Sequence, residues 1–296
     1  MHEYDTNQRA IAAMAIALLA ISFGAIPLIV RAGIPATHLV AMRVTLGGLF
    51  LVGVALATGR FAVPKTNRLR VVVLGVLLAI HWLTFFLAIQ LTTVAVALAV
   101  VYIGPILAAL VSVPVLGEEN RASAWVGLVL AAGGMLLVVR PGAGATLEGV
   151  LVGLVSAVLL AALFVIGKPT AAALGGLTVA MWESLAAAVV LFPFTVQAIR
   201  ESYEFMGEFL ILGVIFTGLS GVIWWSSMAK LPVAVVSVIM YLEPASAVVW
   251  AALFLDESPQ PLTWIGIALV IAGGVVAGAG AVGPAKIPAA EPEAVA

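Results

Sequence analysis

The segment from Val94 to Trp125, VAVALAVVYIGPILAALVSVPVLGEENRASAW, decides the fold, because a related segment follows at Val233 to Trp264, VAVVSVIMYLEPASAVVWAALFLDESPQPLTW. A repeat this long indicates two copies of a whole folding unit, not the short units of a solenoid. The two segments align at a constant offset of 139 residues, which pairs Tyr102 with Tyr241, Pro105 with Pro244, Glu118 with Glu257 and Trp125 with Trp264.

The composition indicates a protein that resides in a lipid bilayer. Hydrophobic residues make up 64% of the chain and charged residues 9%, and the mean hydropathy is +1.25, whereas about a quarter of the residues in soluble proteins are charged. The net charge of -1 gives no sign of nucleic-acid binding, and the lack of cysteine excludes disulfides and thiolate chemistry. We therefore expect lipid, and no nucleic acid, as a partner.

Ten apolar segments are long enough to cross a hydrocarbon core, which takes about 20 helical residues. We expect an all-α membrane protein, since lipid leaves the backbone of an open sheet unsatisfied. The first run is predicted to be a retained span and not a signal peptide, because it is long and lacks a convincing cleavage site. The predicted spans are Ala10 to Val30, Ala36 to Ala57, Val71 to Ile89, Thr93 to Leu116, Ala122 to Val139, Leu147 to Gly167, Gly175 to Ala198, Phe209 to Met228, Val233 to Leu255 and Leu262 to Ala281.

The basic residues predict how the chain is oriented. With the N-terminus inside, nine of the 13 Lys and Arg residues lie on the cytoplasmic side and three outside, as the positive-inside rule favours. Both termini are then cytoplasmic, with residues 283–296 as a disordered tail, and the short loops favour a bacterial inner membrane. Five helices per repeat is an odd number, so the second repeat, 142–282, is inverted relative to the first, 1–141. Inverted repeats are typical of secondary transporters, with the substrate cavity where the halves meet.

The chain from about residue 10 to residue 281 resembles the ten-helix EamA-type members of the drug/metabolite transporter superfamily, and within them the exporters of aromatic and other neutral amino acids. The resemblance lies in the ten spans, in the Tyr-x-x-Pro motif of the fourth and ninth spans, and in the acidic turns Gly117-Glu118-Glu119 and Asp256-Glu257 ahead of Trp-x-Gly. It implies a cavity lined mainly by the third, fourth, eighth and ninth spans, with the first and sixth contributing. It also implies export as the direction of transport.

His81 lies in the middle of the third span, beside Trp82 and one turn before Phe85. Ionisable residues within a span usually face a cavity or a polar partner. One reading is an imidazole that contacts substrate, and the other is a hydrogen bond between helices. We favour the cavity and predict these substrate-binding residues: His81, Trp82, Phe85, Tyr102, Phe164, Trp224 and Tyr241. For Trp224 a place at the lipid interface is also open.

Glu243 is the one carboxylate that the sequence places near the midplane of the ninth span. Apolar surroundings disfavour its charged form, so the side chain should hold a proton much of the time, which suits proton coupling. A structural role, in which Glu243 donates to carbonyls freed by Pro244, fits as well. Arg43 and Glu183 lie about two turns inside their spans, so we expect snorkelling or pairing between helices for both.

Pro105 and Pro244 occupy matching mid-membrane positions, three residues after Tyr102 and Tyr241. Proline removes a backbone hydrogen bond and kinks a helix, so the pair predicts two symmetric hinges for alternating access. Packing without movement is the other reading.

Glycines in the fifth and tenth spans predict close helix packing. This packing either joins the two repeats or builds a dimer, so both a monomer and a homodimer stay open. The glycines are Gly133, Gly134, Gly273, Gly274 and Gly278.

The residues argue against an enzyme and limit the substrate. The sequence has no spacing typical of metal ligands, no nucleophile with its base and no phosphate-binding loop, so we expect neither a metal nor a cofactor. A carrier of phosphorylated solutes would need Lys or Arg at the midplane, yet Lys168 and Lys230 lie at span ends.

A cavity of rings, hydroxyls and one imidazole suits a neutral or zwitterionic small molecule with an apolar body, such as an amino acid. Two alternatives stay open. One is an exporter of drugs or other hydrophobic metabolites, and the other is a membrane scaffold or binding subunit that transports nothing.

Overall fold

The structure is a computed structural model that describes residues 5–29, 34–92, 94–139, 146–254 and 260–282. All regular secondary structure in these ranges is helical. The helices of the first repeat are α1 (Thr6–Phe23), α2 (Ile26–Ile29), α3 (Ala36–Ala57), α4 (Arg68–Leu91), α5 (Val94–Val101), α6 (Ile103–Leu116) and α7 (Ala122–Val139). Those of the second are α8 (Leu147–Leu174), α9 (Gly176–Val190), α10 (Phe192–Glu201), the 3-10 turn η1 (Tyr203–Phe205), α11 (Met206–Leu210), the π-helix η2 (Ile211–Leu219), α12 (Ser220–Met228), α13 (Val233–Met240), α14 (Leu242–Phe254) and α15 (Pro261–Val282).

Most of the predicted spans appear as continuous apolar helices. Within the described ranges, eight runs are long and apolar enough to cross a membrane, and α7 is a shorter apolar helix where the fifth span was predicted. The predicted span over Gly175 to Ala198 contains a sharp bend, because α9 and α10 meet at an angle of 75°. Pro193, the second residue of α10, lacks the N–H that would continue the helix. The predicted tail 283–296 and the turn Asp256-Glu257 lie outside the described residues.

Both repeats contain a break at the matching tyrosine. Tyr102 alone separates α5 from α6, and Tyr241 alone separates α13 from α14. Each break lies three residues before a proline, Pro105 or Pro244. Proline has no N–H, so the carbonyl four residues before it lacks the donor that a continuous helix would supply. The interruption expected from the two prolines is therefore present, and its use as a hinge stays a prediction.

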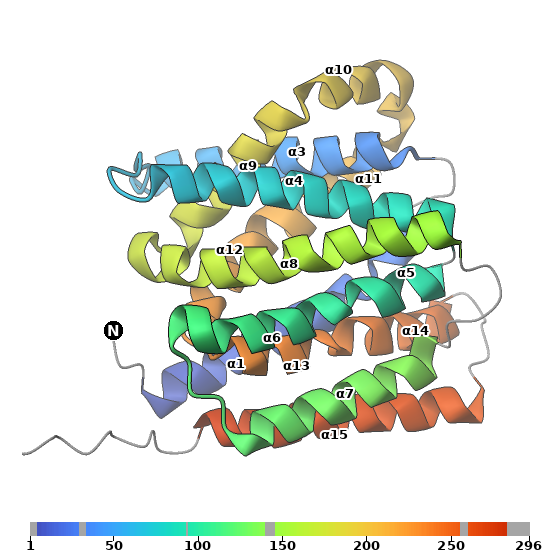
Figure 1. The fold of residues 1–296 in the computed structure, drawn as a ribbon. Helices are drawn as coiled ribbons and strands as arrows, with labels where there is room; N and C mark the ends of the chain where they lie inside the picture. Colours follow the sequence, from blue (N-terminus) through green and yellow to red (C-terminus); the bar gives the residue numbers. More distant parts are fainter. Residues whose placement is uncertain (1–4, 30–33, 93, 140–145, 255–259, 283–296) are drawn as a thin grey trace, which may run out of the picture.

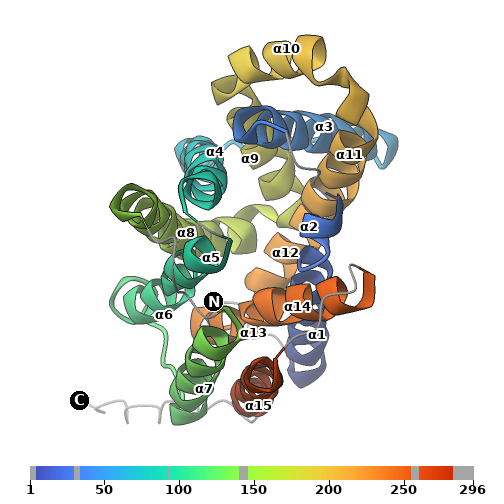
Figure 2. The ribbon, with the colours of Figure 1, turned by 90° about the vertical axis from the view of Figure 1, so that its right-hand side faces the viewer.

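The helices form a bundle whose long axes run roughly side by side (Figure 1). In that view α1 begins and α15 ends on the same side of the bundle. Figure 2 looks along the helices and shows α7 and α15 together at one edge, with α3 and α10 at the opposite edge. Large apolar side chains cover the outside, among them Ile11, Leu69 and Val129, each more than 60% exposed. An apolar exterior of this kind fits lipid and not water.

The helices α7 and α15 pack against each other through glycines. A Cβ placed on Gly134 would lie 2.6 Å from the carbonyl oxygen of Gly266, and one on Gly127 would lie 2.6 Å from that of Gly273. The two pairs show that the helices run antiparallel, and each pair maps onto the other by the repeat offset. The close contact therefore joins the two repeats within one chain. By contrast, nothing lies within 4 Å of a Cβ on Gly133, Gly274 or Gly278.

Candidate functional site

A cavity of about 680 Å³ lies in the half of the bundle away from the start of α1. The lining part of α4 runs from Leu78 to Ile89, its second half, and α1 contributes only its last residue, Phe23, together with Gly24. The wall is mostly apolar. Its rings are Phe23, His81, Trp82, Phe85, Phe86, Tyr102, Phe164, Phe216, Trp224 and Trp225.

The cavity brings together most of the residues singled out from the sequence. Its wall includes His81, Trp82, Phe85, Tyr102, Phe164 and Trp224, and also Glu243, Pro105 and Pro244. Tyr241 is not part of the wall, because it is buried beside Tyr102 with the two ring centroids 5.4 Å apart. The second predicted span of each repeat, which contains α3 or α9, also contributes to the wall, and the family resemblance did not imply this contribution.

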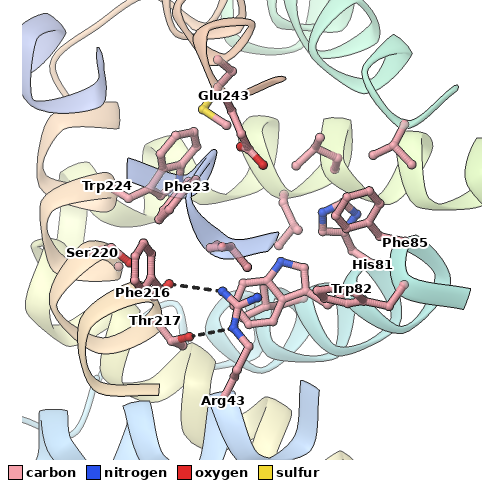
Figure 3. A pocket seen from close by; sticks show the side chains of 18 of the residues that line it. Phe23, Arg43, His81, Trp82, Phe85, Phe216, Thr217, Ser220, Trp224 and Glu243 are labelled. Atoms are coloured by element: carbon pink, nitrogen blue, oxygen red, sulfur yellow. Dashed lines mark hydrogen bonds between the residues drawn. The ribbon is translucent and has the colours of Figure 1, made fainter. Parts of the chain in front are cut away.

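Arg43 reaches the cavity from α3 and is almost fully buried. Its Nε donates to the hydroxyl of Thr217 and one Nη donates to the carbonyl of Phe216, both at 3.3 Å. The guanidinium lies over the ring of Trp82, 4.1 Å from the centroid (Figure 3), a favourable cation–π geometry. We expected either snorkelling or pairing between helices for Arg43. The structure shows contacts between helices and no snorkelling. We did not predict from the sequence that Arg43 faces the cavity.

The π-helix η2 provides both acceptors of Arg43. Its wider turn allows the hydroxyl of Thr217 to donate to the carbonyl of Leu212, five residues earlier, at 2.8 Å. Such segments are rare and often occur at functional sites. No motif in the sequence indicates a π-helix here.

Glu243 enters the cavity from the first turn of α14, on the side opposite Arg43 (Figure 3). The two side chains attract each other electrostatically, but these two described residues form no ion pair. The hydroxyl of Tyr102 also interacts with the Glu243 carboxyl, yet it is buried with no partner at hydrogen-bonding geometry. Glu243 therefore presents a carboxyl group that has charged and polar neighbours but no ion pair with Arg43 and no hydrogen bond of normal geometry with the described residues.

A second carboxyl group, that of Glu183 on α9, lies in the same wall and is 4% exposed. Its Oε2 accepts a hydrogen bond of 2.6 Å from the indole N–H of Trp225, while its Oε1 has no partner among the described residues. The ring of Trp225 fits against Gly167, where a Cβ would lie 2.0 Å from the ring. Glu183 thus makes a contact between helices, as expected, and Trp225 belongs to the wall.

His81 both lines the cavity and bonds to a neighbouring helix. Its Nδ1 lies 3.0 Å from the carbonyl of Ser156 on α8, and the Ser156 hydroxyl donates to the carbonyl of His81 at 3.0 Å. A carbonyl only accepts, so this geometry assigns the proton to Nδ1 and leaves Nε2 as an acceptor. The two readings of His81 from the sequence are thus compatible.

The opposite side of the bundle is held together by a polar cluster of Glu118, Lys168, Leu231 and Val233. Lys168 on α8 forms an ion pair with Glu118, which follows α6, and also donates to the carbonyl of Leu231 at 2.6 Å. The second oxygen of Glu118 accepts from the N–H of Val233 at the start of α13, at 2.8 Å. These contacts tie the first repeat to the second on the side where α1 begins (Figure 1).

A helical bundle with an apolar exterior, and with a cavity that contains charged groups between its two repeats, is the architecture of a membrane transport protein. Comparison with protein families gives the same answer. The chain belongs to the EamA-like transporter family, whose model matches residues 10–140 and again residues 147–278.

Individual relatives are distant. The chain is similar to a Bacillus subtilis (strain 168) protein named uncharacterized transporter YxxF, with 23% identity over 91% of this chain and 90% of the relative. It is also similar to the threonine/homoserine exporter RhtA of Escherichia coli (strain K12), with 27% identity over 78% of each chain. A crystal structure of 21% identity superposes with a TM-score of 0.78 and covers 91% of this chain and 98% of that chain. At that identity the match supports the fold alone.

Proposed function

We propose that the protein is a secondary transporter that exports small neutral or zwitterionic metabolites, most of all amino acids, across the cytoplasmic membrane of a bacterium. The observation that carries the proposal is the cavity itself, an aromatic enclosure with a guanidinium and two carboxyl groups in its wall. The name of the relative RhtA, a threonine/homoserine exporter, supports amino acids as the substrate class.

The proposed architecture is two inverted five-helix repeats, residues 1–141 and 142–282, with both termini in the cytoplasm. The antiparallel contact of α7 with α15 and the matching breaks at Tyr102 and Tyr241 support it. In this orientation the cluster around Glu118 closes the cytoplasmic side, and the cavity belongs to a state that faces outward. Movement about Pro105 and Pro244 would exchange this state with one that faces the cytoplasm.

The aromatic wall also suits a drug or another hydrophobic metabolite, which is the second candidate substrate. The charged groups favour an amino acid, since a purely apolar solute would leave Arg43 and Glu243 in the cavity wall without a group of opposite charge. Glu243 is in addition our candidate for proton coupling. An imposed pH gradient should then change transport into proteoliposomes, and Glu243→Gln should remove the response to the gradient.

Counterflow in proteoliposomes tests the proposal. Purified protein is reconstituted with an excess of one unlabelled amino acid inside, and the labelled amino acid is added outside. We expect transient accumulation of label with threonine, homoserine or a larger apolar amino acid, and none in liposomes without protein. Accumulation with hydrophobic drugs alone would favour the second candidate. A membrane scaffold would give no counterflow with any solute, and that result would end the proposal.

A further inference from the structure

Arg43 and Glu243 lie on opposite walls of one cavity and both point into it (Figure 3). Arg43 comes from α3 in the first repeat and Glu243 from α14 in the second. They form no ion pair with each other. The cavity therefore has a positive pole and a negative pole with space between them.

The guanidinium of Arg43 has N–H groups that make no hydrogen bond with the described residues. Arginine carries five N–H donors, and the protein engages Nε and one Nη through single hydrogen bonds of 3.3 Å. The other Nη makes no hydrogen bond with the described residues. The ring of Trp82 and the two acceptors in η2 fix the plane of the guanidinium, so its free edge is preorganised for a carboxylate, whose two oxygens match the fork of an arginine.

The carboxylate of Glu243 is free in the same sense. It makes no hydrogen bond of normal geometry with the described residues, and the hydroxyl of Tyr102 beside it is also without a partner. Glu183, the other carboxyl group in the wall, is different because the indole of Trp225 already donates to it at 2.6 Å. Glu243 is therefore the better acceptor for a cation.

Opposite charges that lie apart in a largely apolar enclosure are costly, because each loses water without gaining a counter-charge in contact with it. A solute with one negative and one positive group would compensate both walls at once. We propose that Arg43 binds the α-carboxylate and Glu243 the α-ammonium of an amino acid, while the aromatic wall contacts its side chain. This assignment rests on the proposed function and deepens it, since it explains how one cavity accepts amino acids with different side chains.

Competition between an amino acid and its blocked derivatives tests the assignment. The probe is whichever of threonine, homoserine, leucine and phenylalanine gives the strongest counterflow. Its competitors are the primary amide of the same amino acid, which lacks the carboxylate, and the N-acetyl derivative, which lacks the ammonium. In the unmodified protein each derivative should inhibit about tenfold more weakly than the parent, or worse, because a charge-assisted hydrogen bond is lost.

The variants should remove this discrimination one pole at a time. In Arg43→Gln the parent should inhibit no better than its amide, and in Glu243→Gln no better than its N-acetyl derivative. Because each comparison is a ratio within one variant, a lower amount of folded protein does not affect it. Arg60→Gln, which removes an exposed cation, is the matched control and should leave both ratios unchanged.

Three results would overturn the assignment. Equal inhibition by the parent and both derivatives in the unmodified protein would show that binding depends on neither the carboxylate nor the ammonium. If the parent amino acid still inhibited Arg43→Gln more strongly than its amide does, Arg43 would not be the carboxylate site. If the parent and its N-acetyl derivative inhibited Glu183→Gln equally, while the parent remained the stronger inhibitor of Glu243→Gln, the ammonium site would be Glu183 and not Glu243. In all three cases counterflow of amino acids continues, so the proposed function stands; absence of counterflow is the separate failure of that function.

Discussion

The hydroxyl of Tyr241 donates a hydrogen bond of 2.8 Å to the main-chain carbonyl of Tyr102, its counterpart 139 residues earlier in the other repeat. The bond joins the two helix breaks directly. The reverse bond does not form, because the hydroxyl of Tyr102 lies beside Glu243 in the cavity wall and has no partner at hydrogen-bonding geometry. Two residues in equivalent sequence positions therefore have different environments, one structural and one facing the cavity.

This asymmetry predicts opposite consequences for the two Tyr→Phe substitutions. Tyr241→Phe removes a buried hydrogen bond and should lower the stability of the folded protein by about 1 kcal/mol. Tyr102→Phe removes a hydroxyl that has no partner at hydrogen-bonding geometry among the described residues, so it should leave stability nearly unchanged and weaken transport. Thermal unfolding in detergent and counterflow measure the two effects. Equal loss of stability in both variants would contradict the asymmetry.

A second prediction concerns the bond between Trp225 and Glu183. Trp225→Phe leaves both carboxyl oxygens of Glu183 without a donor in a buried position, which should cost about 1–3 kcal/mol of stability. Glu183→Gln is the matched control, because the amide oxygen still accepts from the indole N–H, and its effect should be smaller. Unfolding measurements compare the two variants. A larger loss in Glu183→Gln would mean that the carboxylate charge, and not the hydrogen bond, stabilises this contact.

Much of the fold could be predicted because it depends on local properties of the sequence. The apolar runs predict helices by their length, and the repeat at a constant offset predicts two related halves. The prolines predict the breaks beside Tyr102 and Tyr241. The bend between α9 and α10 was not predicted, although the sequence contains Pro193, since proline is tolerated within membrane helices. How large such a bend becomes depends on the packing of the helices around it.

The candidate site was only partly predictable for a related reason. Aromatic residues and His81 attract notice in an apolar helix, and they do line the cavity. Arg43 lies only two turns from the end of its span, where snorkelling is the usual outcome. Its actual place depends on the carbonyl of Phe216 and the hydroxyl of Thr217, more than 170 residues away in the chain. A contact of that kind has no signature in a single sequence.

The contact between α7 and α15 gives a third prediction, with controls in the same helices. Alanine usually stabilises a helix relative to glycine by up to about 1 kcal/mol. Gly133→Ala and Gly274→Ala should therefore be neutral or slightly stabilising, because their surroundings are open. Gly134→Ala and Gly273→Ala place a methyl group 2.6 Å from a backbone oxygen and should cost about 1–3 kcal/mol. Thermal unfolding of the four variants decides the matter, and an equal response of all four would argue against the intramolecular contact.

The cluster of Glu118, Lys168, Leu231 and Val233 gives a fourth prediction, which also tests the orientation of the chain. The protein has no cysteine, so one introduced at Val235, 2% exposed near the start of α13, reports directly on access from that side. Glu118→Ala removes the ion pair with Lys168 and the acceptor of the Val233 N–H. The cytoplasmic side should then open more often, and the cysteine should react several-fold faster with a thiol reagent that does not cross membranes.

The sidedness of the labelling follows from the same reasoning. With cytoplasmic termini, the faster reaction should occur in inside-out vesicles and not in right-side-out vesicles. A cysteine introduced at Thr58, which is already exposed, should react at the same rate with and without Glu118→Ala. An unchanged rate at Val235 would mean that the cluster does not hold this side closed. Acceleration only in right-side-out vesicles would reverse the proposed orientation, because the ion pair between Glu118 and Lys168 would then close the outer side of the membrane.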